Sequence, residues 1–333
     1  MARPEMREFG LIRRLQEVFE GSAGTAGASC VIGIGDDAAV LEPATGRQLV
    51  TCADTLVEGV HFPRDTSARA IGHKALAVNL SDLAAMGAEP SWFLLALTLP
   101  EVRPDWLDGF AQGMAELASR SGIRLVGGDT TTGPLNICVT ALGQVERGRV
   151  LTRSGARPGD RIVVSGVPGR AAYALDELKH GREPEPAARR ALEFPEPRLA
   201  LGQALAGRAT ACIDISDGLA ADLGHVIAAS GVGAKLDLGS LPAAGALSLL
   251  PPQQRWAYQL SGGDDYELCF TVPPEELKNL DRLADRAEVG LNVVGEVTAG
   301  QGLVINTPDG GVHEPSTRGY EHFGAGARSG ADS

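Results

Sequence analysis

Five short apolar runs in this sequence end in the same way, in a turn of small residues that carries aspartate. The five stretches are VIGIGDDAAV, LVTCADTL, RLVGGDTTTG, ACIDISDG and LSGGDDYELCF. Apolar runs of roughly four to eight residues bounded by Gly, Asp and Ser are typical of buried strands. Helical patterns separate several of these runs, so we expect an α/β (α+β) fold in both halves of the chain.

Amphipathic patterns cover much of the remaining sequence. We expect helices over residues 7–20, 67–86, 104–122, 217–230 and 274–287, with further helical material over 170–206 that FPEPR interrupts. Ser67 is a suitable N-cap and Gly87 a suitable stop for the second of these helices. We expect strands over residues 92–99, 123–128, 135–145, 161–166, 210–216, 234–238 and 266–272. A Pro/Gly turn predicts a hairpin between residues 38–43 and 47–54.

The length of the chain indicates two domains. At about 150 residues per domain, 333 residues suffice for two. Residues 146–160 are rich in charge, Gly and Pro and lack apolar periodicity, so the boundary is expected there. We predict domains over residues 1–148 and 149–323. Residues 324–333 are too small and polar to form a core and are expected to be disordered.

Charge and composition argue against several kinds of partner. The chain has 30 Lys and Arg against 42 Asp and Glu, a net charge of −12, whereas nucleic acids are bound by basic surfaces. The five cysteines lack paired spacing, which favours reduced thiols in the cytosol. The N-terminus has no apolar signal-peptide core, and WFLLALTL is too short to cross a bilayer. We expect a cytoplasmic protein that binds neither nucleic acids nor membranes.

The aspartates of the turns are more informative as a set than singly. Each one alone is explained equally well by turn or capping chemistry. If the turns meet in one cleft, two unit charges about 4 Å apart repel by about 4 kcal/mol at an effective dielectric constant of about 20. Protonation or bound cations would relieve this repulsion. Hard carboxylate oxygens favour magnesium or calcium, and magnesium completes its coordination with water and phosphate oxygens.

The stretch GGDTTTG is interpreted as a phosphate-binding turn that works through cations. Its glycines allow backbone N–H groups to point at phosphate oxygens, and Asp129 would hold a metal ion on the same phosphates. No lysine accompanies it, and the chain has no P-loop, protein-kinase or zinc signature. Arg153, at the domain boundary, could reach a phosphate, whereas the residues alone leave the role of His61 open.

Eight motifs, in order along the chain, resemble those of bacterial thiamine-monophosphate kinases. They are GIGDDAAV, DTLVEGVHF, KALAVNLSDLAAMGAEP, VGGDTTTGP, LTRSGARPGD, IDISDGLAADLGHV, SGGDDYELCFTV and GYEHF. The resemblance implies the two-domain aminoimidazole ribonucleotide synthetase-like fold. It also implies a homodimer in which N-terminal sheets join into a barrel, and an ATP cleft that the C-terminal domain completes. The implied reaction converts ATP and thiamine monophosphate to ADP and thiamine diphosphate, with several magnesium ions per site.

The same resemblance assigns roles to individual residues. Six aspartates match metal ligands, and three of them, Asp54, Asp129 and Asp214, are placed at the catalytic centre. The six are Asp37, Asp54, Asp82, Asp129, Asp214 and Asp217. The residues that match nucleotide contacts are Gly128, Asp129, Arg153 and Ser216. The residues that correspond to substrate contacts are His61, Asp264 and Thr317.

Three sites depart from the family pattern. Where the family commonly has two hydroxyl residues before Asp54, this chain has Cys52 and Ala53, which leaves metal contacts there to backbone carbonyl groups. Asp264 stands in place of a common glutamate, which keeps the charge and shortens the reach. Thr317 replaces an aromatic residue that packs on the substrate ring, and Tyr320 is a candidate substitute.

The expected chemistry is direct in-line phosphoryl transfer. The acceptor is an ionised phosphate that needs little base catalysis, so positioning and charge neutralisation would carry the rate. One alternative is a related synthetase that uses ATP and releases inorganic phosphate. A second is a non-catalytic nucleotide- or calcium-binding module, although the sequence has no EF-hand loop.

Overall fold

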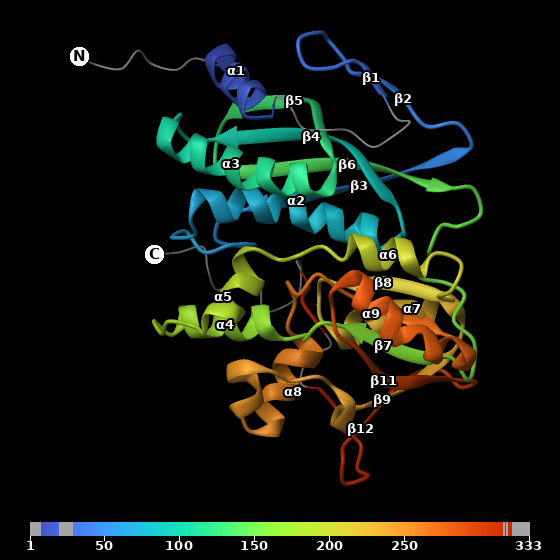
Figure 1. Ribbon diagram of the computed structural model, residues 1–333. Coiled ribbons are helices and arrows are strands. Elements are labelled where there is room, and N and C mark those ends of the chain that lie inside the picture. Colours follow the sequence, from blue (N-terminus) through green and yellow to red (C-terminus); the bar gives the residue numbers. More distant parts are fainter. Residues whose placement is uncertain (1–7, 20–28, 316, 318, 322–333) are drawn as a thin grey trace. The chain divides into compact units, whose positions relative to one another are not determined.

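The computed structural model describes residues 8–19, 29–315, 317 and 319–321 (Figure 1). The chain forms two compact units. One comprises Met1–Val150 with Glu193–Ala206, and the other comprises Leu151–Leu192 with Gly207–Ser333. The segment 193–206 therefore clusters with the first unit, although sequence reasoning assigns it to the second domain. The tail predicted over 324–333 lies outside the described residues.

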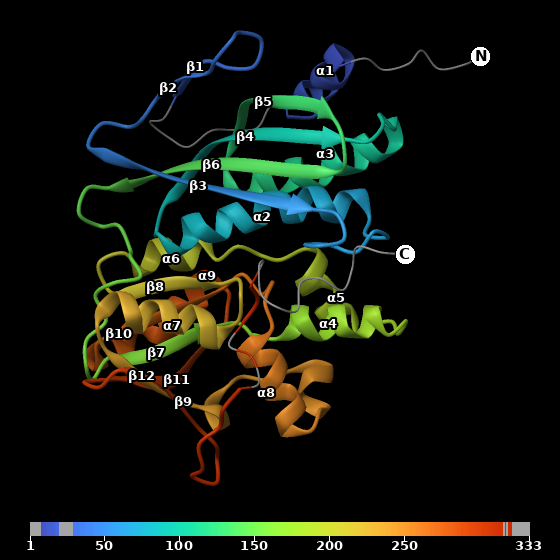
Figure 2. The same ribbon diagram turned by 180° about the vertical axis from the view of Figure 1, so that it is seen from behind.

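The first unit is built on a four-stranded sheet. In spatial order its strands are β3 (Arg47–Val57), β6 (Asn136–Glu146), β4 (Glu89–Leu99) and β5 (Arg124–Thr132). Strands β4 and β5 are parallel, and the other neighbours are antiparallel. Helices α2 (Ala68–Ala85) and α3 (Pro104–Ser121) lie on one face of the sheet. Within the described residues no helix covers the opposite face, which Figure 2 presents to the viewer.

Four smaller elements complete the first unit. Helix α1 (Glu8–Phe19) packs against α3 and β5, and helix α6 (Leu199–Leu205) packs against α2. Strands β1 (Ser29–Ile32) and β2 (Val40–Glu42) form a separate antiparallel pair. The predicted hairpin between residues 38–43 and 47–54 is therefore wrong. Strand β3 instead pairs with β6 along all of its 11 residues, a much longer ladder than the three residues of β2 could provide.

The predicted phosphate-binding turn is a strand in the structure. Strand β5 continues through Asp129 to Thr132, and its threonines pair in parallel with residues of β4. These β-branched residues suit a pleated strand. Gly128 has a φ of 153°, and a Cβ atom there would lie 1.9 Å from the carbonyl oxygen of Leu95. Glycine is therefore required where β5 approaches β4 most closely.

Helix α2 begins and ends as its sequence predicts. The Ser67 side chain accepts a hydrogen bond from the N–H of Ala70 (3.3 Å), and Gly87 follows the helix with a φ of 67°. Every residue from Ala70 to Ala85 except Asp82 is buried. The helix is close to α3 because each carries a glycine at the contact: a Cβ on Gly72 would meet the Phe110 carbonyl oxygen at 2.0 Å.

The second unit contains a six-stranded sheet. In spatial order its strands are β12 (Gly302–Asn306), β9 (Gly233–Asp237), β11 (Leu291–Thr298), β7 (Arg161–Ser165), β10 (Glu267–Val272) and β8 (Ala211–Ile215). Only β12 and β9 are parallel among these neighbours in the described chain. The helices are α4 (Arg170–Lys179), α5 (Pro186–Glu193), α7 (Leu219–Ser230), α8 (Pro252–Ser261) and α9 (Leu280–Ala287). Helix α7 packs on β8 and α8 and contributes Leu219, Leu223 and Val226 to the core.

None of the helices in the described part of the chain combines the length and apolarity that a membrane crossing needs.

The contact between α2 and α3 generates the first prediction. A Cβ on Gly113 would lie 2.0 Å from the carbonyl oxygen of Arg69, so Gly113→Ala must push the helices apart. We expect it to lower the free energy of unfolding by about 2 kcal/mol or more. Gly109→Ala is the matched control on the same helix, because its Cβ would meet Ala68 Cβ at an ordinary 3.4 Å. Helix propensity should make this control neutral or stabilising by about 0.5–1 kcal/mol, as urea denaturation can measure. Equal losses in both variants would contradict the packing explanation.

Candidate functional site

The first unit brings Asp54 and Asp82 together around a buried amide. Asn79 on α2 is 0% exposed, and its Oδ1 accepts a hydrogen bond from the backbone N–H of Asp54 on β3 (3.2 Å). Its Nδ2 donates to the carbonyl oxygen of Ala75 (3.2 Å), which fixes the orientation of the amide. Asn79 therefore ties β3 to the helix that carries Asp82, three residues further on.

Cys52 belongs to the same group. Burial raises the pKa of its thiol, and the charges of Asp82 and Asp54 raise it further. The Cys52 Sγ lies 3.4 Å from the carbonyl oxygen of Asn79 and 3.8 Å from its Oδ1. The thiol is therefore neutral at physiological pH and adds no charge to the two carboxylates. Ala53, the next residue of β3, is exposed.

Two other predicted ligands of the first unit lie on different strands. Asp129 is exposed on β5 and is paired with Ala96 of β4, so strands β6 and β4 lie between it and the strand of Asp54. Asp37 is exposed in the connection between β1 and β2, where its backbone N–H donates to the Asp36 carboxylate (2.9 Å). Gly128 immediately precedes Asp129 at the close approach to β4.

His61 lies in a tight turn that follows β3. Its Nδ1 accepts a hydrogen bond from the backbone N–H of Val57 (2.9 Å). Its carbonyl oxygen accepts one from the Nζ of Lys74 on α2 (3.1 Å). Both the ring and the backbone of this predicted substrate residue are thus held by the first unit.

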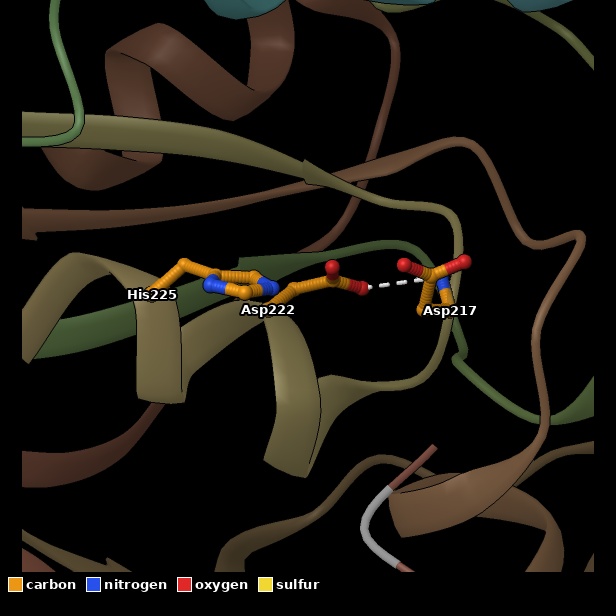
Figure 3. Close-up of side chains that lie close together, drawn as sticks. All are labelled: Asp217, Asp222 and His225. Atoms are coloured by element: carbon orange, nitrogen blue, oxygen red, sulfur yellow. Dashed lines mark hydrogen bonds between the residues drawn. The ribbon is translucent and has the colours of Figure 1, made fainter. Parts of the chain in front are cut away.

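In the second unit the motif IDISDG forms a turn organised by a carboxylate that sequence reasoning missed. One oxygen of Asp222, in the first turn of α7, accepts hydrogen bonds from the backbone N–H groups of Ser216 (3.0 Å), Asp217 (3.1 Å) and Gly218 (3.1 Å). Figure 3 shows the bond to Asp217. Asp214, at the end of β8, is 5% exposed. Asp222 thereby sets the conformation of the turn that carries three predicted site residues.

The same carboxylates repel one another. Burial raises the pKa of Asp222 to about 7, and the charges of Asp217 and Asp214 add to the rise, while the N–H groups of the turn oppose it. Ligand atoms of Asp217, Asp222 and His225 all lie within 4.8 Å of one another (Figure 3). A cation among these oxygens would relieve the repulsion. The carboxylate oxygens of Asp217 and Asp222 in this group are hard ligands that suit a divalent ion, and Asp214 adds negative charge nearby.

The motif SGGDDYE packs directly on this turn. The backbone N–H of Asp264 donates to the carbonyl oxygen of Ser216 (2.9 Å), and that of Tyr266 donates to Ile215 (2.9 Å). Asp264 and Tyr266 have φ angles of 69° and 52°, which are uncommon for residues other than glycine. The Tyr266 hydroxyl also donates to Asp264 Oδ1 (2.9 Å). These contacts hold the backbone of Asp264 against Ser216 and its carboxylate against the Tyr266 hydroxyl.

A second missed residue stands next to Asp264. Asp265 is buried and accepts a hydrogen bond from the N–H of Gly169 (2.7 Å), where α4 begins. Burial raises the pKa of Asp265 well above its ordinary value. The two adjacent aspartates of GGDDYE indicate acidic residues at this place in the sequence. Only the structure shows that Asp264 and Asp265 have different roles. Asp264 is half-buried, whereas Asp265 supports a helix N-terminus.

The last two predicted residues, Arg153 and Thr317, belong to the second unit and accept hydrogen bonds there through their backbones. The hydroxyl of Ser230 donates to the carbonyl oxygen of Arg153 (3.4 Å), and the Arg153 residue is exposed. The hydroxyl of Ser261 donates to the carbonyl oxygen of Thr317 (2.5 Å). Tyr320 is 48% exposed, and its N–H donates to the carbonyl oxygen of Asp217 (3.1 Å). The segment with Thr317 and Tyr320 therefore reaches the IDISDG turn.

Two family models match the chain in succession. The model of the AIR synthase related protein, N-terminal domain, matches residues 35–145, and the model of its C-terminal domain matches residues 157–307. The fold and the acidic turns thus define the class as that of the AIR synthase related proteins.

Individual relatives narrow the class. Thiamine-monophosphate kinase of Escherichia coli (strain K12) is 43% identical over 326 residues, which cover 95% of this chain and 98% of that protein. The crystal structure of the enzyme from Stenotrophomonas maltophilia K279a is 46% identical with a TM-score of 0.82, and the match covers 90% of this chain and 97% of that one. AaThiL complexed with AMPPCP and TMP is 30% identical with a TM-score of 0.73, over 97% and 99% of the two chains. The chain belongs to the thiamine-monophosphate kinase family, which confirms the resemblance seen in its motifs.

Asp222 provides the second prediction. Its pKa rises from an ordinary 3.8 to about 7 on folding, so the folded state binds more protons than the unfolded state between these values. Its contribution to stability is present below pH 4 and is lost as pH rises through about 7. In metal-free protein, the free energy of unfolding relative to Asp222→Asn should fall by an amount on the order of 4 kcal/mol across this range. Urea denaturation in chelator at a series of pH values measures it. A difference that is constant with pH would refute the assignment.

Proposed function

We propose that this chain transfers the γ-phosphoryl group of ATP to thiamine monophosphate, giving ADP and thiamine diphosphate. The observation that carries the proposal is its full-length similarity to AaThiL, which binds AMPPCP and TMP. The 43% identity to the Escherichia coli kinase supports the same activity. The acidic groups of the two units offer the chemistry that two phosphorylated substrates require.

We assign magnesium ions to the carboxylates of both units. In the first unit the ligands are Asp37, Asp54, Asp82 and Asp129, with backbone carbonyl groups of Cys52 and Ala53. In the second unit they are Asp214 and Asp217. The residues present fit the ion, because their oxygens are hard ligands and because the raised pKa of Asp222 reports negative charge that a cation would offset. When bound, magnesium would neutralise charge on the phosphates.

The remaining assignments concern the two substrates. Gly128, Asp129, Arg153 and Ser216 are proposed to contact the nucleotide. His61, Asp264 and Thr317 are proposed to contact thiamine monophosphate. Asp264 is shorter than the glutamate common in the family, but its carboxylate is held by the Tyr266 hydroxyl at 2.9 Å. This hydrogen bond fixes the orientation of the shorter Asp264 side chain.

The protein's own part in the reaction is positioning. The acceptor phosphate is ionised at neutral pH, so in-line attack requires alignment rather than proton removal. Asn79 holds the backbone of Asp54, and Asp222 holds the turn of Ser216 and Asp217. Groups fixed in this way need no reorganisation during phosphoryl transfer. A related synthetase that releases inorganic phosphate is the alternative, and the product distinguishes the two.

We also propose that the enzyme is a cytoplasmic homodimer. Leu95 and Leu97 of β4 are buried, whereas Leu94 and Ala96, which alternate with them, are exposed. The exposed pair therefore points to the face of the sheet that α2 and α3 leave open. A second copy of this sheet would bury that face in the barrel arrangement expected from the family resemblance.

The activity is tested directly with purified protein, MgATP and thiamine monophosphate. We expect thiamine diphosphate and ADP in equal amounts, no inorganic phosphate, and no thiamine diphosphate when thiamine replaces the monophosphate. Asp129→Asn should lower kcat by about 100-fold or more with an unchanged melting temperature. Asp281→Asn, an exposed aspartate on α9, is the control and should keep normal activity. Near-normal turnover in the Asp129 variant would remove it from the site.

The dimer is tested by light scattering. Wild-type protein should have about twice the 34.6 kDa mass of one chain, because a shared sheet face would be stable only when buried. Leu94→Glu places a charge on that face and should give a monomer. Leu249→Glu is the control, since Leu249 is 85% exposed in the second unit. A wild-type monomer, or two variants that behave alike, would argue against this interface.

A further inference from the structure

The turn that carries His61 is closed by its own backbone. The N–H groups of Val60 and His61 both donate to the carbonyl oxygen of Val57, at 3.1 and 3.0 Å. The N–H of Gly59 donates to the carbonyl oxygen of Phe62 (2.9 Å), and the Phe62 side chain is buried. The turn is therefore a defined structure rather than an extended surface loop.

The hydrogen bond to the ring of His61 selects one tautomer. The backbone N–H of Val57 can only donate, so the Nδ1 that receives it at 2.9 Å must be unprotonated. A neutral imidazole then carries its proton on Nε2. His61 is half-buried. The backbone of strand β3 thus makes Nε2–H the donor of this ring.

Lys74 holds the other end of the same residue. Its side chain is 3% exposed within the buried face of α2, and its ammonium group donates to the His61 carbonyl oxygen (3.1 Å). Burying an ammonium group is unfavourable unless it gains strong hydrogen bonds. An apolar side chain would fill this place in α2 without that cost. One of the hydrogen bonds that compensate for this burial goes to the backbone of the His61 turn.

We propose that Lys74 is a positioning residue that keeps His61 in its Nε2–H tautomer, so that the ring donates a hydrogen bond to a phosphate oxygen of the acceptor substrate. This inference rests on the proposed function, in which His61 contacts that substrate. The arrangement suits an acceptor that presents a phosphate oxygen, because the Nε2–H of a neutral imidazole can donate a hydrogen bond to it. In this proposal Lys74 acts through the backbone of His61 and needs no contact with a reacting atom.

The tautomer is measured first, without any activity assay. Long-range ¹H–¹⁵N NMR of the full-length protein distinguishes a protonated from an unprotonated ring nitrogen in each of the six histidines, and His61→Gln identifies the signals of His61. In the wild type we expect an unprotonated Nδ1 and a protonated Nε2. In Lys74→Met we expect a mixture of tautomers. A protonated Nδ1 in the wild type, or an unchanged ring in the variant, would overturn the proposal.

Kinetics then connect the tautomer to the substrate. Lys74→Met should raise KM for thiamine monophosphate by about 10-fold, the effect of one lost hydrogen bond to a charged group. KM for ATP should change less than about 2-fold, and Lys74→Arg, which keeps a cationic donor, should restore part of the loss. Equal changes in the two KM values would contradict the assignment.

A matched control separates positioning from damage to the helix. His73, the preceding residue, is also buried in α2, and its Nε2 lies 2.8 Å from the carbonyl oxygen of Pro195. His73→Gln should leave the His61 ring signals and the KM for thiamine monophosphate unchanged. The same shift in both variants would overturn the specific role of Lys74. If the wild type forms no thiamine diphosphate, the proposed function fails, whereas the NMR result still decides the tautomer.

Discussion

The burial of helix α2 is the constraint on which the candidate site of the first unit depends. Water is excluded along the helix from Ala70 to Ala85, apart from the half-buried Asp82. A polar side chain in such a place must find its partner within the protein. Asn79 finds the N–H of Asp54, and Lys74 finds the carbonyl oxygen of His61. The packing that stabilises the unit therefore also places its candidate residues.

In the second unit, the candidate site residues are positioned by contacts at the N-terminus of a helix. Asp222, which is 2% exposed, accepts three N–H groups of the turn before α7, where the partial positive charge of the helix end favours a carboxylate. The carbonyl groups of the same turn are also fixed. The carbonyl oxygens of Ile215 and Ser216 accept hydrogen bonds from the N–H groups of Tyr266 and Asp264, respectively. Two motifs that lie about fifty residues apart in the sequence are thereby joined into one structure.

Local sequence patterns predict the ends of helices correctly but do not predict which strands pair or which side chains bind backbone groups. Ser67 and Gly87 mark the ends of α2 correctly, because capping depends on residues within one helical turn. The hairpin assigned to residues 38–54 was wrong because pairing depends on a partner that is distant in the sequence, β6. The GGDTTTG stretch reads as a turn by composition, yet parallel pairing with β4 makes it a strand. Asn79 and Asp222 were missed for the same reason: their function lies in contacts with backbone groups that the sequence does not display.

The charges of the two acidic groups fit the magnesium sites proposed above. In the first unit, burial and the neighbouring aspartates keep the Cys52 thiol neutral, so Asp54 and Asp82 provide the charge. In the second unit, the pKa of Asp222 of about 7 reduces its mean charge at neutral pH and leaves Asp214 and Asp217 as the charged pair. Magnesium commonly takes one or two carboxylates and completes its shell with water and phosphate oxygens. At Cys52, where the resemblance implies a hydroxyl residue, the thiol stays protonated and therefore leaves the charge of this group unchanged.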